Sequence, residues 1–341
     1  MMLMIIEAET HATRSPSGPS KSVWLGGAVG LAYFLKLHLH TQSAGSIEPD
    51  PDSDDKQSRR IWWSLVIMDR WHASSTSSPL LIPDGSVVVY PEDQTLLGEP
   101  LYQLARLSMI LGHFAEAALV VPTDLTALIV PPIQLVGTLL RGELERWRES
   151  LPQTFFPPSN SPLVHLCYWN LRILMELRLP ESEPQDLLAI AVQIVTQLTN
   201  NSNLISPLTY HSTALATLTL VELTSLESSK EEAEKSLQSL RQTRIAHSAW
   251  DEAIREMINR KQSPATTILE SQHALTASQG LQRLADLATA TEEGRDPVAA
   301  DDSKKESEQI VPLRSPQRYQ ELREAIRNGY LSYILGGETN L

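Results

Sequence analysis

The sequence predicts an all-α protein, an irregular bundle of several helices, and three observations support this fold class. Apolar residues recur every three or four positions in several stretches, as one side of an amphipathic helix requires. Only Ser86–Tyr90 favours an extended backbone, and Gly85 and Pro91 flank it, so we interpret it as a connection. Clusters of proline, serine, glycine and asparagine separate the periodic stretches, as turns between helices do.

Five stretches carry this helical spacing, in addition to a tryptophan-rich segment at residues 59–71. Each predicts a helix with one apolar side that must be buried against a neighbour. In chain order they are Leu104, Leu107, Leu111, Phe114 and Ala118; Ile133, Val136, Leu140, Leu144, Trp147 and Leu151; Leu187, Ile190, Ile194 and Leu198; Leu281, Leu284 and Leu287; and Tyr319, Leu322, Ile326 and Ile334.

The turn-forming clusters are short, so we expect them to punctuate one helical domain over residues 1–290. They are residues 43–58, 74–79, 152–162, 180–184 and 200–207. In residues 291–317 charge, proline and serine replace the apolar spacing, which predicts a flexible linker. Residues 318–341 are then expected to form a C-terminal helix that packs on the main domain.

Composition and charge limit the classes of function. With 42% hydrophobic and 20% charged residues, the 341-residue chain has the composition of a folded protein. Its formal net charge of -13 opposes attraction to phosphates, so the chain alone is not expected to bind DNA. Its single cysteine, Cys167, excludes an intrachain disulfide and a cysteine-rich zinc site, and its apolar neighbours predict a buried, inert thiol.

No stretch has the properties of a secretory signal or a membrane span. The apolar start Met1–Ile6 lacks a basic flank and a cleavage site. The longest apolar run, Val23–Leu35, contains three glycines and is shorter than the roughly 18–20 residues that cross a bilayer. We therefore expect an intracellular protein with no membrane partner.

Residues 59–71, Arg-Arg-Ile-Trp-Trp-Ser-Leu-Val-Ile-Met-Asp-Arg-Trp, form the most informative segment. As a helix it has two adjacent sides made of large apolar groups and one charge each: Trp62, Leu65, Val66 and Asp69 on one, and Trp63, Ile67 and Arg70 on the other. Such a helix is nearly surrounded by protein. Asp69 and Arg70 then need partners, because a buried unpaired charge is strongly destabilising.

This segment resembles the centre of the fungal-specific transcription factor domain. That domain is the middle homology region of the fungal zinc binuclear cluster transcription factors, with the usual form Glu-x-Arg-Arg-Arg-x-Trp-Trp, apolar residues, then Asp-Arg. Residues 26–38, with Gly26, Gly27, Leu31, Leu35, Leu37 and His38, are similar to its preceding helix, which ends in Gly-Leu-His. Residues 78–84, with Pro79 and Asp84, are similar to its Gly-Arg-Pro, apolar, Ile-x-Asp segment. The resemblance covers residues 22–114, which are the motif-bearing core.

The sequence departs from the family pattern at a few positions. Lys36 stands where glycine is usual before Leu-His, Lys56 and Ser58 replace the expected Glu and first Arg, and Ser77-Ser78 replaces Gly-Arg. The resemblance implies a structural motif and no catalytic, cofactor-binding or metal-binding residue. The motif residues are Arg59, Arg60, Trp62, Trp63, Asp69, Arg70, Pro79, Asp84 and His38.

The resemblance also implies what the chain does. In this family an all-helical regulatory domain lies between an N-terminal DNA-binding cluster and a C-terminal activating region. It controls transcription by RNA polymerase II in the nucleus through contacts with co-regulators and, in some cases, a small effector, and it is compatible with a homodimer. The DNA-binding cluster needs six cysteines around two zinc ions. We therefore expect this chain to hold no cofactor and to reach DNA only through a module outside it or through a partner.

Several functional interpretations of single residues have a simpler alternative. His38 and His40 cannot share a metal ion on a helix, because side chains two positions apart point about 200° apart. His72 and His113 have no obvious catalytic partner in the sequence and are expected to be packed or exposed. Arg59 and Arg60 could contact phosphate, but a salt bridge with the acidic run at residues 50–55 is favoured. The tryptophans could line an effector pocket, and core packing is the preferred interpretation.

No motif of a common enzyme class is present: neither a Gly-x-Ser-x-Gly elbow, a phosphate-binding Gly-rich loop, nor His-Glu-x-x-His. We therefore expect a non-enzymatic protein. A second hypothesis is kept beside the regulator: a helical scaffold or small-ligand-binding protein that does not act in transcription.

Overall fold

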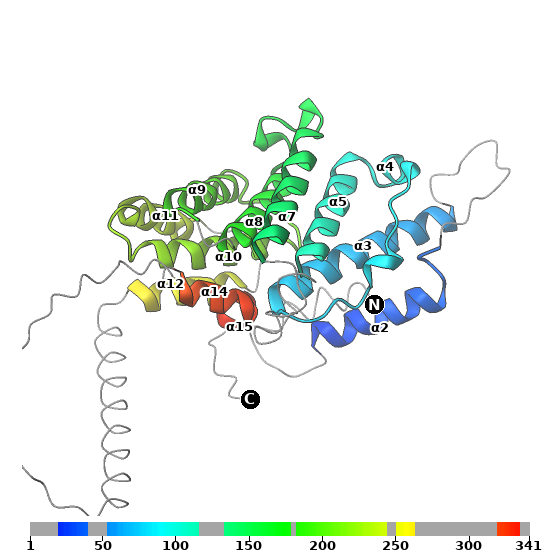
Figure 1. Ribbon diagram of the computed structural model, residues 1–341, viewed down its shortest axis with the longest axis horizontal. Coiled ribbons are helices and arrows are strands. Elements are labelled where there is room, and N and C mark those ends of the chain that lie inside the picture. The colour runs from blue at the N-terminus through cyan, green and yellow to red at the C-terminus, as the bar shows by residue number, and fades with distance from the viewer. Residues whose placement is uncertain are drawn as a thin grey trace, which may run out of the picture. The chain divides into compact units, whose positions relative to one another are not determined.

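The structure is a computed structural model, and it describes residues 20–39, 53–115, 133–178, 182–243, 250–262 and 319–334 (Figure 1). All regular elements in these ranges are helical, which confirms the all-α prediction. The chain divides into two compact units, one of residues 1–256 and 319–341 and the other of residues 257–318. The second unit is described only at residues 257–262, so nearly all the described helices belong to the first.

Twelve α-helices and three short 3₁₀ turns make up the described residues. They are α2 (Lys21–Phe34), α3 (Asp54–Thr76), η1 (Asp84–Ser86), α4 (Pro91–Leu97), α5 (Glu99–Phe114), α7 (Ile133–Glu149), η3 (Gln153–Phe155), η4 (Pro158–Asn160), α8 (Pro162–Arg178), α9 (Pro184–Asn200), α10 (Thr209–Leu223), α11 (Lys230–Gln242), α12 (Trp250–Gln262), α14 (Gln320–Arg327) and α15 (Tyr330–Ile334).

Helix α3 is the centre of the N-terminal group of helices. It packs against α2, α4, α5 and α15, and Figure 1 shows α2 running alongside it. Every residue from Leu65 to Ser75 is buried, which is why this part of the helix carries no amphipathic pattern. The expectation that the tryptophan-rich helix is surrounded by protein is therefore confirmed.

The later helices form a second group that joins the first through α5. Helix α5 packs on α7 and α8, and α8 in turn packs on α9 and α10. Helix α10 is buried along most of its length although it is rich in threonine. Thr213, Thr217 and Thr219 donate to carbonyl oxygens four residues earlier, at 3.1, 2.7 and 2.8 Å, so their hydroxyl groups are satisfied inside the core.

The C-terminal segment contains two short helices, where the sequence suggested one. Helix α14 ends at Arg327 and α15 begins at Tyr330, with Gly329 between them at φ 91°. A Cβ atom on Gly329 would lie 2.8 Å from backbone atoms of Thr76, so only glycine allows α15 to approach the end of α3. Helix α15 contacts both α3 and α10 and so connects the two groups of helices.

Three of the five predicted stretches each correspond to a single described helix, and two boundary predictions were wrong. The spacings at 104–118, 133–151 and 187–198 fall on α5, α7 and α9, whereas Ala118, the stretch 281–287 and the linker 291–317 lie outside the described residues. Residues 54–58, expected to be a turn, form the start of α3, because Asp54 and Asp55 interact favourably with a helix N-terminus.

The sequence prediction also placed the end of α3 too early. Residues 74–76 were expected to lie in a turn, yet the helix continues to Thr76. The hydroxyl groups of Ser74, Ser75 and Thr76 donate back to helix carbonyl oxygens at 3.0, 2.9 and 2.8 Å, which satisfies them within the helix.

Two departures from the family pattern fall on left-handed backbone. Lys36 follows α2 at φ 57°, and Ser77 follows α3 at φ 53°. Both stand where the family usually has glycine, the residue that adopts this conformation without a steric cost. The structure thus gives the physical reason for glycine at each position.

Replacing Lys36 with glycine is expected to stabilise the protein. The exposed lysine holds φ 57° at a cost that glycine avoids, so the free energy of unfolding should rise by about 0.5–1 kcal/mol. Urea unfolding followed by circular dichroism measures the change. Lys36→Ala is the matched control and should give no such gain, because alanine keeps the strain; equal gains from both variants would contradict the explanation.

Candidate functional site

Arg70 is the centre of a buried hydrogen-bonded network in the core of the motif. Its guanidinium is fully buried and donates from Nη1 to Asp69 Oδ2 at 2.8 Å and to the Ile82 carbonyl at 2.6 Å. Its Nη2 donates to Asp84 Oδ1 at 2.5 Å. Arg70 therefore ties α3 to the connecting segment that follows it, residues 77–90.

Asp69, the partner of Arg70 in the ion pair, also connects α3 to residues 77–90. Its Oδ1 accepts the Leu81 N–H and its Oδ2 the Ile82 N–H, both at 3.0 Å. Burial raises the pKa of the Asp69 carboxyl, and the hydrogen bonds from Leu81, Ile82 and Arg70 oppose that rise. With hydrogen bonds to each other and to the backbone of the neighbouring segment, both residues have the partners that a buried charge requires.

Gly112 in α5 makes room for the Arg70 side chain. A Cβ atom at this position would lie 2.6 Å from Arg70 Nε and 2.9 Å from its Cδ. It would also lie 3.1 Å from Asp84 Oδ1. The glycine thus lets α5 pack directly over the ion pair.

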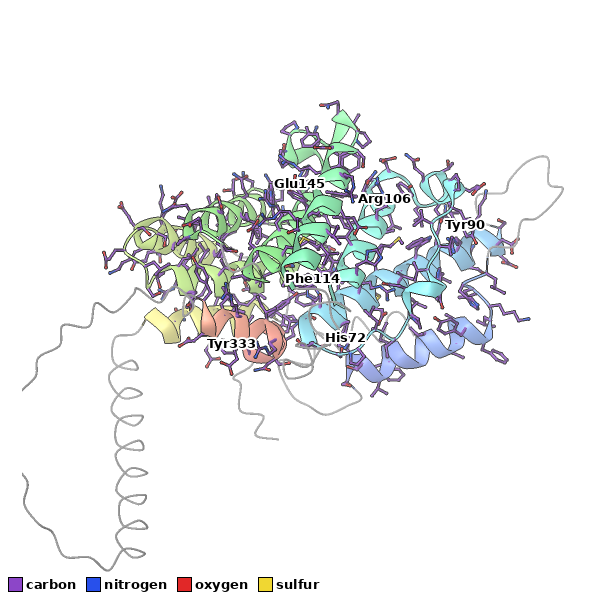
Figure 2. All side chains as sticks on the ribbon, in the orientation of Figure 1. His72, Tyr90, Arg106, Phe114, Glu145 and Tyr333 are labelled. Atoms are coloured by element: carbon purple, nitrogen blue, oxygen red, sulfur yellow. The ribbon has the colours of Figure 1, made fainter. Side chains whose placement is uncertain are left out.

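Arg59 forms a second buried ion pair, near the start of α3. Its Nε and Nη2 donate to the two carboxylate oxygens of Asp93 at 2.8 and 2.7 Å, a bidentate geometry. Its Nη2 also donates to the Val88 carbonyl at 2.5 Å, and the guanidinium lies 5.3 Å from the Trp63 ring and 5.0 Å from the Tyr90 ring. Figure 2 labels Tyr90 in this part of the molecule.

The partner of Arg59 differs from the one suggested by the sequence. A salt bridge was expected with the acidic run at residues 50–55, and the structure pairs Arg59 with Asp93. Burial acts to raise the pKa of Asp93, but the hydrogen bonds from Arg59 and the Tyr90 N–H outweigh it and hold the pKa below its usual value. The carboxylate is therefore ionised and bound at neutral pH.

The remaining motif residues lie around these two pairs. Arg60 is partly buried and donates from Nε to the Leu96 carbonyl at 3.1 Å. The His38 ring packs edge-on against Tyr33, with ring centroids 5.0 Å apart, and lies 5.8 Å from Trp62. Pro79 is exposed and takes no part in the network.

The three tryptophans of α3 pack in the core. Trp62 and Trp63 have no exposed surface and Trp71 has 1%. Trp62 meets the Tyr33 ring of α2 edge-on at 5.6 Å, and Trp71 Nε1 donates to Ser108 Oγ of α5 at 3.2 Å. These contacts agree with core packing, the preferred interpretation of the tryptophans.

This arrangement positions helices and presents no reactive group. Asp69, Arg70, Arg59 and Asp93 are all at least 95% buried, so none can reach a substrate in solution. Within the described ranges, no three His, Cys, Asp or Glu side chains lie close enough together to hold a metal ion. Cys167 is fully buried in α8, as predicted, and burial raises the pKa of its thiol.

A comparison with known families connects this geometry to a function. The fungal-specific transcription factor domain matches residues 8–103, which include the whole of α3 and α4. Over these residues the chain is similar to the fungal-specific transcription factor domain. No solved structure matches the chain.

A relative gives the same indication for a longer part of the chain. An uncharacterized transcriptional regulatory protein of Schizosaccharomyces pombe is 33% identical over 275 residues, which cover 76% of this chain. The match covers 31% of that protein, so the chain spans less than a third of the length of this curated relative. Among the described residues of the chain, no helix is long and apolar enough to cross a membrane.

Sequence reasoning missed several contacts between residues that lie far apart in the chain. Asp93 could have been suspected, because an acidic residue two positions after Pro91 is common in a first helical turn. No local signal marks the contact of His211 with Tyr330, whose hydroxyl lies 2.9 Å from His211 Nδ1 across 119 residues. His113, which seemed isolated, has its Nδ1 3.3 Å from Glu143 of α7.

His72 connects α3 with α2 and is a buried titratable group. The ring, labelled in Figure 2, is buried, with Nε2 2.9 Å from Ser22 Oγ. Burial, and to a smaller extent the positive charge of Lys21, lowers the pKa of His72 from 6.5 to about 4. Burial also lowers the pKa of His211, whose ring lies 5.5 Å from that of Trp71, the residue before His72.

We expect the free energy of unfolding to fall by about 3 kcal/mol as the pH drops from 6.5 to 4, through His72 alone. Between these two pH values His72 binds a proton in the unfolded chain but not in the folded domain. The loss of stability therefore begins near the pKa of His72 in the unfolded chain and ends near its lower pKa in the folded domain. Urea unfolding at pH 7.5 and 4.5 measures it. His72→Gln, which does not titrate, should show a correspondingly smaller difference, whereas an unchanged difference would contradict the assignment to His72.

Proposed function

We propose that this chain is the regulatory part of a fungal transcription regulator and that it acts in the nucleus. The observation that carries the proposal is the match of the transcription factor domain to residues 8–103, together with the name of the relative, a transcriptional regulatory protein. Two of the motif residues, Arg59 and Arg70, each form a buried ion pair on α3, so the segment that gives the match also holds the centre of the N-terminal group of helices.

The domain acts through protein contacts, and not by binding DNA or by catalysis. A formal net charge of -13 disfavours the phosphate backbone, and a single cysteine cannot build a six-cysteine zinc cluster. DNA is therefore reached through a module outside this chain or through a partner. The chain needs no cofactor for this role, and its partners are transcriptional co-regulators, with a small effector as a further ligand class.

The contacts between the helices suit a domain that holds its protein-binding surfaces in a fixed position relative to one another. Two buried arginines join α3 to residues 81–93, and α15 joins α3 to α10. Because protein cores are closely packed, a displacement of side chains at one of these contacts also shifts the packing of the other group of helices. A co-regulator that binds one group can thereby influence the other.

A reporter experiment tests the proposed function. The full chain is fused to a heterologous DNA-binding domain, and transcription of a reporter carrying the cognate site is measured in fungal cells over several growth conditions. We expect transcription to rise or fall relative to the DNA-binding domain alone. A matched fusion with Trp62→Ala, which removes a buried ring, should lose the effect because it unfolds the domain.

The amount of each fusion is measured by immunoblotting so that loss of protein is distinguished from loss of function. An unchanged reporter in all conditions, with the fusion present in the nucleus, would contradict the proposal and favour a helical scaffold outside transcription. A reporter effect that persists in an unfolded Trp62→Ala fusion would show that the folded domain is not its source.

A further inference from the structure

The segment that follows α3 begins with an accessible Ser-Pro pair, Ser78 and Pro79. Ser78 is partly exposed, Pro79 is exposed, and residues 78–80 form neither a helix nor a turn. Two other Ser-Pro pairs occur in the described residues, but Pro162 is the first residue of α8 and Pro207 lies in the turn before α10. Of these three pairs, only the one after α3 therefore lies in an irregular stretch of backbone at the surface.

The Ser78 hydroxyl group is bound to the last turn of α3. Its Oγ lies 2.8 Å from Thr76 Oγ1. The Thr76 hydroxyl group uses its hydrogen to donate to the His72 carbonyl oxygen at 2.8 Å, so Ser78 is the donor in the pair with Thr76. A phosphate ester has no hydrogen on Oγ, and two acceptor oxygens at this distance repel each other. Phosphorylation of Ser78 therefore breaks this contact.

This contact lies where α3 meets the two C-terminal helices. Ser77, the residue before Ser78, donates from Oγ to the Ile326 carbonyl oxygen of α14 at 2.9 Å. Gly329, between α14 and α15, approaches the end of α3 so closely that a Cβ atom on it would lie 2.8 Å from Thr76 backbone atoms. Because the packing is this close, a displacement at Ser78 is transmitted to the attachment of α14 and α15 on α3.

A negative charge is unfavourable at this position. The Ser78 N–H donates to the Ala73 carbonyl oxygen at 3.3 Å, so Ser78 adjoins the C-terminal end of α3, and the Ile326 carbonyl belongs to the last turn of α14. The C-terminal end of a helix carries the negative end of its dipole, and the last turn of α3 has no basic residue. Arg327 is the basic residue in the last turn of α14, and it is exposed, so solvent weakens its attraction for an anion.

We propose that Ser78 is phosphorylated by a proline-directed protein kinase and that the phosphate loosens the attachment of α14 and α15 to α3. Kinases of this class recognise a serine directly followed by proline. The γ-phosphoryl group of ATP forms a new P–O bond with Ser78 Oγ, its bond to the bridging oxygen breaks, ADP leaves, and the hydroxyl proton passes to the catalytic aspartate of the kinase. The product carries about -1.5 to -2 charges at neutral pH.

Phosphorylation of the full chain tests the proposal. The purified chain is incubated with a mitogen-activated protein kinase, with and without ATP, and peptide mass spectrometry locates the phosphate. Hydrogen exchange then compares the amides of α14 and α15 in the two samples, with α9, which packs on α8, α10 and α11, as the internal reference. Ser78→Ala is the matched control, because it keeps every other Ser-Pro pair of the chain.

We expect phosphate on Ser78 and an exchange of α14 and α15 that is about three- to thirtyfold faster than without ATP, as unfavourable interactions with two helix ends predict. The two Ser78→Ala samples should exchange equally. A chain without phosphate on Ser78 would overturn the proposal. Unchanged or slower exchange in the phosphorylated chain would overturn it too, slower exchange in favour of an ion pair with Arg327. The measurement involves no transcription, so its failure is distinguishable from a failure of the proposed function.

Discussion

Replacing Arg70 with methionine is expected to lower the free energy of unfolding by about 3–5 kcal/mol. The substitution keeps most of the side-chain volume but leaves the Asp69 carboxylate, which is 1% exposed, without its cation. It also removes the hydrogen bonds to the Ile82 carbonyl and to Asp84. Guanidinium unfolding followed by far-ultraviolet circular dichroism measures the effect.

Arg60→Met is the matched control for this prediction. Arg60 lies on the same helix, is only partly buried and donates to the Leu96 carbonyl, so its loss should cost less than about 1.5 kcal/mol. A second variant, Arg70→Met with Asp69→Leu, should recover part of the stability, because the Asp69 carboxylate, the most deeply buried partner of Arg70, is removed together with its cation. Equal effects of Arg70→Met and Arg60→Met would show that the Arg70 network contributes little.

Replacing Trp62 with alanine is expected to cost about 3–5 kcal/mol, close to the whole stability of a marginal domain. The indole has no exposed surface and packs against Tyr33, so its removal leaves a cavity between α2 and α3. Thermal unfolding followed by circular dichroism measures the loss. Because the cavity left by the indole lies between α2 and α3, we also expect α2 to unfold more easily.

Ile61→Ala is the control for the tryptophan. Ile61 is the preceding residue of α3 and is 43% exposed, so its truncation should cost less than about 1 kcal/mol. A melting temperature of Trp62→Ala as high as that of Ile61→Ala would place the indole at the surface and would contradict the packing of α3.

The fold class was predictable because helical spacing is a local property. Stretches such as Leu187–Leu198 carry it clearly, and α9 forms there. The burial of Trp62 and of the Asp69–Arg70 pair was predictable as well, because large apolar groups on two adjacent sides of a helix leave few ways to expose it. The resemblance to the transcription factor domain was carried by the same residues, and the family match confirms it.

The partners of the charged residues were not predictable in the same way. Asp93 lies 34 residues from Arg59, and the expectation favoured an acidic run closer in sequence. The contact of Gly112 with Arg70 could not be predicted from the sequence, because a glycine within a helix can occur for many reasons. Long-range contacts of this kind depend on how helices pack, which local spacing does not specify.

The split between α14 and α15 has a similar origin. The apolar spacing of Leu322, Ile326 and Ile334 is compatible with one continuous helix, and Gly329 alone does not exclude it. The approach of Gly329 to the Thr76 backbone decides the break, together with the bond from Ser77 Oγ to the Ile326 carbonyl at 2.9 Å. Both contacts join parts of the chain about 250 residues apart, beyond the range of local pattern.

Hydrogen exchange of the intact chain tests most directly whether α3 and its ion pairs lie at the centre of the N-terminal group of helices. Mass spectrometry would follow exchange in α3 and in α4, a seven-residue helix with one buried residue. Backbone amides of residues 62–75 should exchange only through global unfolding and be among the slowest in the chain. Exchange of these amides as fast as those of α4 would contradict the central position of α3.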